Sequence, residues 1–219
     1  MASISASSNV TSGELLNHAK ISLWRLTIGF TLGVASGCFL GIAVGTSKLA
    51  SRLIEPTLLG LIPVPPIAWI PLLIVMLGIG EASKIMLIAI GSFCTLFIHT
   101  AHAVRAADAQ LIELARTLKK TKSTMIWHLF LPSAMPTVIA ACRVAMALSW
   151  TLLLCAEIIA SSRGLGWLIW DSRNFSRADD MIAGMIAVAV LGKLTDMLLQ
   201  RLEIILTPWQ RTFRSVQVD

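Results

Sequence analysis

The sequence has 219 residues, of which 56% are apolar and only 14% charged, whereas soluble proteins have about 45–50% and about 25%. With a mean hydropathy of +0.78, this excess of apolar side chains must face lipid, which excludes a soluble globule, a disordered chain and a soluble nucleic-acid-binding domain. The net charge of +6 indicates instead an excess of Lys and Arg on the cytoplasmic side of a membrane.

Five stretches of the chain are mostly apolar over about 20 residues, the length that crosses a bilayer. They follow a polar, Ser-rich N-terminal segment at residues 1–22, which lacks the apolar stretch of a signal peptide. The predicted spans cover residues 26–45, 58–77, 85–104, 137–159 and 181–205. The fold class is therefore all-α: a polytopic helical membrane protein with about five transmembrane helices in one domain, residues 23–210, and a C-terminal tail, residues 211–219.

Glycines follow one face of the first predicted span. They recur every four residues, at Gly29, Gly33, Gly37, Gly41 and Gly45. Such a stripe lets a second helix backbone approach closely. We therefore expect this span to pack against another helix rather than to be surrounded by lipid.

Prolines interrupt the second predicted span. Its segment LIPVPPIAWIP contains Pro63, Pro65, Pro66 and Pro71. Because proline removes a helical hydrogen bond and clashes with the preceding turn, this span cannot be one regular helix. Irregular backbone at membrane depth is tolerated where it is buried in protein or lines a cavity, so the segment is either a kinked helix or an element that lines a transport pathway.

A charged loop, at about residues 105–132, separates the third and fourth spans. Its middle has a helical pattern, with Leu111, Leu114, Ala115 and Leu118 on one face. A short amphipathic helix of this kind lies on the membrane surface or binds a partner. With this loop in the cytoplasm, ten Lys and Arg residues lie inside and six outside, which favours an outside N-terminus and an inside C-terminus.

From Glu113 to Pro136 the loop reads ELARTLKKTKSTMIWHLFLPSAMP. This resembles the EAA loop of the permease subunits of binding-protein-dependent ABC importers, which opens with Glu-Ala-Ala and closes with Leu-Pro. Glu113, Leu114 and Ala115 match the opening, and Leu131 and Pro132 match the close. Lys119 stands where the family usually has a Gly that allows a turn, so we expect either a different turn geometry or a continuous helix here.

Two further segments, PVPPIAWIPLLIVMLGIGEASKI and AEIIASSRGLGWLIWDSRNF, resemble the sulfonate, taurine and nitrate type permeases of this family. The resemblance covers residues 13–213, and most relatives have a further N-terminal span that this sequence does not show. It implies transport of a small anion, such as a sulfonate, taurine or nitrate, across the bacterial inner membrane by alternating access.

The resemblance also implies the partners. They are ABC ATPase subunits, an extracytoplasmic solute-binding protein and a second copy of this chain in a homodimer, with no nucleic acid. No G-x-x-x-x-G-K-[ST] motif occurs in the sequence. We therefore expect this chain not to be an enzyme, ATP hydrolysis to belong to a separate subunit, and no cofactor to be bound.

Two sets of residues are candidates for function. The resemblance assigns coupling to the ATPase to Glu113, Leu114, Ala115, Leu118, Lys119, Leu131 and Pro132. The broken span and the polar groups inside spans supply the candidate pathway residues Pro63, Pro65, Pro66, Ser92, Thr95, Arg143 and Glu157. The Ser and Thr hydroxyls could equally bond neighbouring helices, and Lys193 and Asp196, three residues apart, could pair with each other.

Two alternatives remain open. His99 and His102 share one side of a helix, as in an intramembrane metalloenzyme, but a metal site needs further ligands. No H-E-x-x-H motif and no Cys-x-x-Cys pair occurs, so no metal site is predicted. The absent span and Lys119 would also fit a degenerate permease that does not transport.

Overall fold

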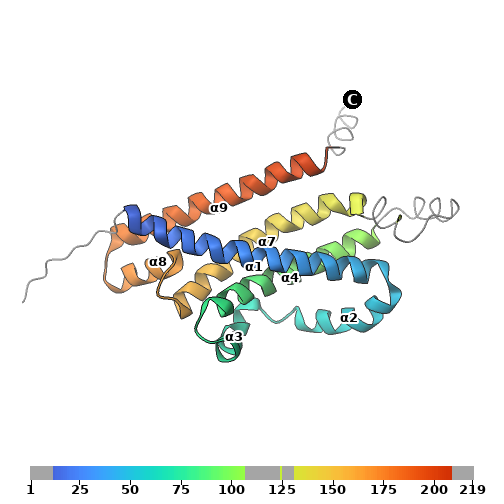
Figure 1. Ribbon diagram of the computed structural model, residues 1–219, viewed down its shortest axis with the longest axis horizontal. Helices are drawn as coiled ribbons and strands as arrows, with labels where there is room; N and C mark the ends of the chain where they lie inside the picture. Colours follow the sequence, from blue (N-terminus) through green and yellow to red (C-terminus); the bar gives the residue numbers. More distant parts are fainter. Residues whose placement is uncertain (1–11, 107–123, 125–130, 209–219) are drawn as a thin grey trace, which may run out of the picture.

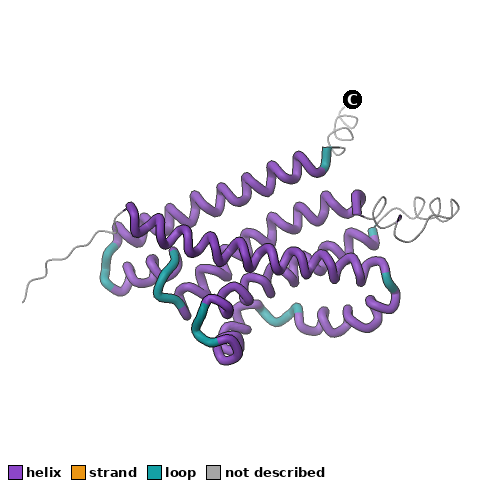
Figure 2. Tube along the Cα trace, in the orientation of Figure 1, coloured by secondary structure: helices purple, strands orange, loops and turns teal. Residues whose placement is uncertain are grey.

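The computed structural model describes residues 12–106, 124 and 131–208. These residues form helices joined by short turns and contain no strand (Figure 2), which confirms the all-α prediction. In chain order the elements are α1 (Ser12–Thr46), α2 (Lys48–Leu61), the 3-10 helix η1 (Pro66–Trp69), α3 (Ile70–Leu77), α4 (Glu81–Arg105), α7 (Leu131–Ala160), α8 (Leu165–Asn174) and α9 (Ala178–Leu206).

Four helices, α1, α4, α7 and α9, are each long and apolar enough to cross a membrane. Each contains the corresponding predicted span. The largest difference is at α1, which begins at Ser12 rather than near residue 26. Polar residues before the predicted span have partners on other elements, such as His18 with the Gly164 N–H and Ser22 with Glu157, which the local sequence pattern does not reveal.

The second predicted span is broken, as its prolines indicate. The helix α2 ends at Leu61, and after a turn that includes Pro63 and Pro65 the chain continues as η1 and α3. The two halves are bent by 87°. Pro66 and Pro71 lie in the first turns of η1 and α3, where the missing N–H would have no helical partner anyway.

The helices α1 and α4 run side by side in the same direction (Figure 1). A Cβ added to Gly33 would lie 2.5 Å from the Ala89 carbonyl oxygen, and one added to Gly41 would lie 2.7 Å from the Thr100 Cβ. The other glycines of the stripe face α4 in the same way. The predicted glycine face is therefore confirmed as the surface on which α4 packs.

This parallel packing fixes the course of the broken span. Because α1 and α4 are neighbours with the same direction, the chain between them must return along their whole length. The helix α4 has 25 residues, which is about 37 Å at 1.5 Å per residue, longer than the hydrocarbon core of about 30 Å. The α2–η1–α3 segment fits one broken crossing, which gives up to five crossings within the described residues.

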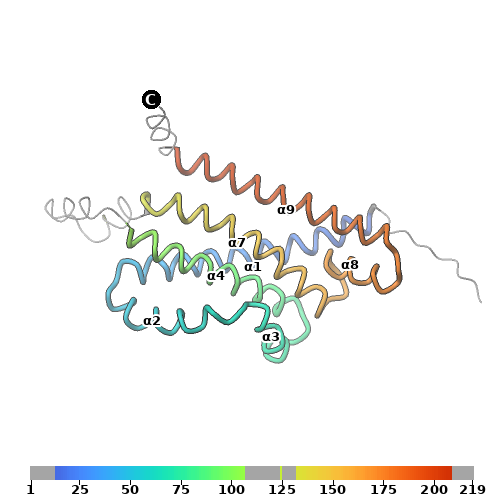
Figure 3. The backbone as a smooth tube through the Cα atoms, turned by 180° about the vertical axis from the view of Figure 1, so that it is seen from behind, coloured from blue at the N-terminus to red at the C-terminus, as the bar shows by residue number. Residues whose placement is uncertain are grey.

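The bundle has two ends, which Figure 3 shows from behind. At one end, called the network end below, Arg25 of α1 donates hydrogen bonds to the first turn of α4, the last turn of α7 and the turn that precedes α8. At the loop end, Arg105 closes α4 beside Val44 and α2, and α7 begins and α9 ends. The loop end is the one that we expect to face the cytoplasm.

Candidate transport pathway and its two ends

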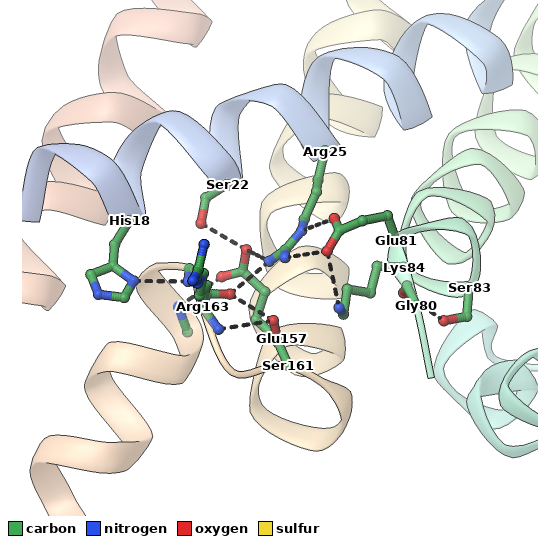
Figure 4. A network of polar contacts seen from close by, with 12 residues as sticks. His18, Ser22, Arg25, Gly80, Glu81, Ser83, Lys84, Glu157, Ser161 and Arg163 are labelled. Atoms are coloured by element: carbon green, nitrogen blue, oxygen red, sulfur yellow. Dashed lines mark hydrogen bonds and ion pairs between the residues drawn. The ribbon is translucent and has the colours of Figure 1, made fainter. Parts of the chain in front are cut away.

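A buried arginine lies at the centre of the polar contacts at the network end (Figure 4). Arg25 of α1 is only 2% exposed. Its Nε and Nη2 donate to the two oxygens of Glu81 at 2.5 and 2.7 Å, and its Nη1 donates to Glu157 Oε1 at 2.9 Å and to the Arg163 carbonyl at 2.8 Å. One guanidinium therefore joins α1 to α4, to α7 and to the turn before α8.

Glu157, one of the candidate pathway residues, is fully buried within this network. Its Oε1 accepts from Ser22 Oγ at 2.7 Å as well as from Arg25, and its Oε2 accepts from the Gly166 N–H at 2.8 Å. Burial of a charge is costly unless it is paired and hydrogen-bonded, and both oxygens of this carboxylate have donors. Glu157 thus binds protein groups in this structure.

The turn at residues 161–166 is shaped around the Glu157 carboxylate. Gly164 has a φ of +121°, a conformation that favours glycine, and a Cβ at this position would lie 2.3 Å from Glu157 Oε1. Its N–H donates to His18 Nδ1 at 3.0 Å, and the Leu165 N–H donates to Ser22 Oγ at 2.9 Å. The α1 helix therefore holds this turn as well as the carboxylate.

In the middle of the bundle, the candidate pathway hydroxyls bond within the protein. Ser92 Oγ lies 2.9 Å from Ser149 Oγ, which joins α4 to α7, and both residues are fully buried. Thr95 Oγ1 donates to the Gly91 carbonyl on its own helix. The structure therefore brings Ser92 to a neighbouring helix, as one of the two sequence interpretations had it.

Arg143 lies on α7 toward the loop end, away from Glu157. It donates to Asp196 Oδ1 on α9 at 2.9 Å and lies 3.5 Å from Glu203. Lys193 lies 3.7 Å from the same aspartate. The predicted pairing of Lys193 with Asp196 is thus present, and Arg143 adds a connection between α7 and α9.

The candidate prolines Pro63, Pro65 and Pro66 lie at the bend, where Pro63 and Pro65 are exposed and Pro66 is half-buried. Ile70 and Leu73 of α3 are buried against α4 and α7. The broken segment therefore covers one side of the bundle, while Pro63 and Pro65 at its bend remain exposed.

At the loop end, the last residue of α4 binds the helix before the bend. Arg105 Nη1 and Nη2 donate to the two oxygens of Glu55 on α2 at 2.7 and 2.5 Å, and Nη2 also donates to Ser51 Oγ at 3.2 Å. The chain enters the charged loop one residue later. This pair ties the entry of the loop to the broken span, and the sequence analysis did not identify it.

Most of the predicted coupling residues, namely Glu113, Leu114, Ala115, Leu118 and Lys119, lie outside the described residues. Leu131 and Pro132 are described as the first residues of α7. His99 and His102 are both exposed on α4, and in the described part of the chain no group of three His, Cys, Asp or Glu side chains could hold a metal ion.

Comparison with known families decides what this bundle is. The family model described as "Binding-protein-dependent transport system inner membrane component" matches residues 31–207. The chain belongs to this family. The predicted ABC importer permease is thereby confirmed, and the several apolar helices agree with a multi-pass membrane protein.

Several named relatives resemble this permease over most of its length. It is 39% identical over 206 residues to SsuC of Bacillus subtilis (strain 168), a protein named for aliphatic sulfonate transport, with 94% of this chain and 75% of SsuC covered. It is 32% identical to the taurine transport system permease TauC of Escherichia coli (strain K12), with 89% and 71% covered. The nitrate import permease NrtB of Synechocystis is 30% identical, with 85% and 68% covered.

A solved structure has the same fold. This permease is similar to a chain of the MetNI methionine ABC transporter, with a TM-score of 0.77, 18% identity and coverage of 91% of this chain and 99% of that chain. At this identity the likeness shows the fold alone.

Proposed function

We propose that this permease is the membrane-spanning subunit of an ABC importer for a small oxyanion, with a sulfonate as the first candidate. The observation that carries the proposal is the 39% identity to SsuC over 94% of this chain. The relatives named for taurine and nitrate transport share one ligand chemistry with it, a compact anionic group with several oxygen atoms.

The complete importer contains two copies of this chain, two ABC ATPase subunits and an extracytoplasmic solute-binding protein, in a bacterial inner membrane. The EAA-like loop supports the ATPase partner, since its acidic opening at Glu113 and its apolar face at Leu114 and Leu118 suit a helix that docks in a groove. The ion pair of Arg105 with Glu55 supports transmission from that loop to the broken span, because it joins the two directly.

Alternating access follows from the way the broken span is attached. The η1–α3 half packs on α4 and α7 through a few apolar side chains, and the bend at Pro63, Pro65 and Pro66 lacks the helical hydrogen bonds that would make the crossing rigid. Movement of this half relative to α4 would open one end of the pathway while the glycine-packed α1–α4 pair stays intact.

The test is uptake by the assembled importer. The permease, its ATPase subunits and its binding protein would be reconstituted in vesicles and supplied with ATP and radiolabelled methanesulfonate, taurine or nitrate. We expect accumulation of at least one of these solutes that requires both ATP and the binding protein. A complex whose ATPase subunit carries a disabled nucleotide site is the control, and failure of all three solutes to accumulate above that control contradicts the proposal.

A further inference from the structure

A polar stripe follows the helix α9 from its middle to the loop end. Four polar residues recur at spacings of three and four, which place them on one face of the helix: Lys193, Asp196, Gln200 and Glu203. A second face of the same helix carries exposed apolar side chains, namely Val190, Leu194, Leu198 and Ile205. The apolar face suits lipid, whereas the polar stripe does not, so the two faces require different surroundings.

Lys193 lies near the middle of this membrane-spanning helix. It stands 15 residues after Ala178 and 13 residues before Leu206, which is about 20 Å from either end at 1.5 Å per residue. Long side chains near the ends of a span reach the headgroups, but a charge that faces lipid at the centre is costly. Charged residues at such a depth face the interior of a bundle or a water-filled cavity.

The interior of this bundle does not cover the stripe. The buried residues of α9 are Asp180 and Gly184, both near its start, and the Lys193 side chain is 69% exposed. Figure 1 shows α9 diverging from α1 and α4 toward the loop end. Of the two surroundings that a charge tolerates at this depth, a water-filled cavity is therefore the one that remains for Lys193.

Two cations share the carboxylate of Asp196 in this stripe. Arg143 of α7 donates to both of its oxygens, at 2.9 and 3.4 Å, a bidentate geometry. Lys193 Nζ lies 3.7 Å from Asp196 Oδ2, which is too long for a hydrogen bond. The ammonium of Lys193 has three N–H donors and donates no hydrogen bond to the described residues, so its donors are available to a ligand.

We propose that the polar stripe of α9, with Arg143 beside it, lines a water-filled part of the transport pathway that opens at the loop end, and that Lys193 binds the oxyanion group of the solute there. In the homodimer, the second copy supplies the facing wall. This inference rests on the proposed function and names its substrate contact. Lys193 is exposed and Asp196 competes for it, so the anion is bound weakly enough to be released, as transport requires.

The first test asks whether water reaches the stripe. The complete importer, with its four native cysteines replaced, would be placed in lipid nanodiscs and treated with a permanently charged methanethiosulfonate reagent. Lys193→Cys is compared with Leu194→Cys, since Leu194 is the next residue, is 55% exposed and lies on the apolar face. We expect Lys193→Cys to react at least about 10-fold faster, as a mass shift shows, because the reactive thiolate forms in water.

Two results of this comparison contradict the water-filled stripe. Equal rates at the two positions would show that the polar and apolar faces have the same surroundings. No reaction at Lys193→Cys would show that the stripe is covered without water, as in a dry interface with the second copy. Both results leave the proposed function standing, because the labelling does not depend on transport.

The second test asks whether Lys193 binds the anion. Gln200→Cys, on the same stripe, would be labelled with and without sodium methanesulfonate, and sodium chloride would keep the ionic strength equal. We expect methanesulfonate to slow labelling several-fold when Lys193 is present, to have no effect in Lys193→Met, and to act again in Lys193→Arg, which restores the charge.

Protection that persists in Lys193→Met, or protection that is absent in every variant, overturns the assignment of Lys193 as the anion contact. The proposed function is tested separately by uptake. A wild-type importer that accumulates none of the three solutes overturns the proposed function itself, whatever the labelling shows.

Discussion

Both ends of α4 are tied by an arginine bound to carboxylates, but the two ties differ in burial. At the network end, Arg25 is 2% exposed and serves two carboxylates from different helices. At the loop end, the Arg105 side chain is 39% exposed, and Glu55 is its one carboxylate partner among the described residues. The two arginines thus differ in burial, and so do the carboxylates of the network end, since Glu157 is fully buried whereas the Glu81 side chain is 55% exposed.

This difference in burial predicts which end of the bundle can open at a low cost in free energy. A buried charge whose partner is removed keeps its full desolvation cost, so a buried network resists any change of one member. An exposed ion pair adds only about 0–1 kcal/mol and is screened by salt. Arg25, Glu81 and Glu157, called the hub below, therefore hold α1, α4 and α7 in fixed positions. At the loop end, contacts can change when a partner binds the loop and moves it.

The largest effect should come from the hub. Replacing Arg25 by Met leaves the fully buried Glu157 without a cation and Glu81 without its bidentate donor. We expect a loss of about 3–5 kcal/mol of stability, seen as a sharply lower melting temperature of the purified permease or as loss of the folded protein. Arg52→Met, at an exposed arginine of α2, is the control. Equal melting temperatures for the two variants would show that the network adds no stability.

Substitution in the glycine stripe should give the next largest effect on stability. Its size can be compared with the effect of removing the Arg25 charge. Gly33→Ala places a methyl group 2.5 Å from the Ala89 carbonyl oxygen. Because this oxygen belongs to the α4 backbone, it cannot rotate out of the way as a side chain could, so we expect a destabilisation of about 1–3 kcal/mol. Gly60→Ala, where nothing lies within 4 Å, should be neutral or stabilising because alanine favours a helix. Thermal unfolding of both variants tests this, and a change of the same sign in both would contradict the packing assignment.

Local patterns in the sequence were enough for much of the fold. The four-residue glycine spacing predicted the face that α4 covers, and the prolines predicted the broken span. Both residue types act on the backbone at their own position, so their effects can be read from the local sequence. The start of α1 and the helix α8 were not predicted. Neither stretch is long and apolar enough to indicate a span, and both meet partners elsewhere in the chain, such as Ser22 with Glu157, 135 positions away.

One signal for the hub was present in the sequence. Arg25 stands four residues before Gly29, in register with the glycine stripe, so a helix continued backward would place it on the packed face. Its carboxylate partners could not be named from the sequence, since no spacing rule links α1 to α7. For the coupling residues, the assignment still depends on the match to the EAA pattern.

A smaller effect on stability is expected at the loop end. Glu55→Gln removes the charge from the pair with Arg105, and we expect a loss of no more than about 1 kcal/mol, with less difference from wild type at high salt. The number of solute molecules taken up per ATP hydrolysed should fall clearly even though the loss of stability is small, because the pair joins the loop to the broken span. The reversed pair, Glu55→Arg with Arg105→Glu, should recover part of that ratio. A ratio that stays at the wild-type value in Glu55→Gln would show that this tie does not transmit movement.

The smallest effect on stability, with a large effect on function, is expected at Glu113. On a solvated surface helix, Glu113→Lys should change stability by less than about 0.5 kcal/mol, so insertion and melting temperature should match wild type. In a partner's groove, the new positive charge would face the donor that bound the carboxylate, at a cost of several kcal/mol to docking. We therefore expect loss of uptake and weaker retention of the ATPase subunits on purification. Lys122→Glu, a charge reversal in the same loop outside the matched pattern, is the control. Wild-type uptake and co-purification in Glu113→Lys would remove Glu113 from the docking surface, since a buried anion cannot be reversed without effect.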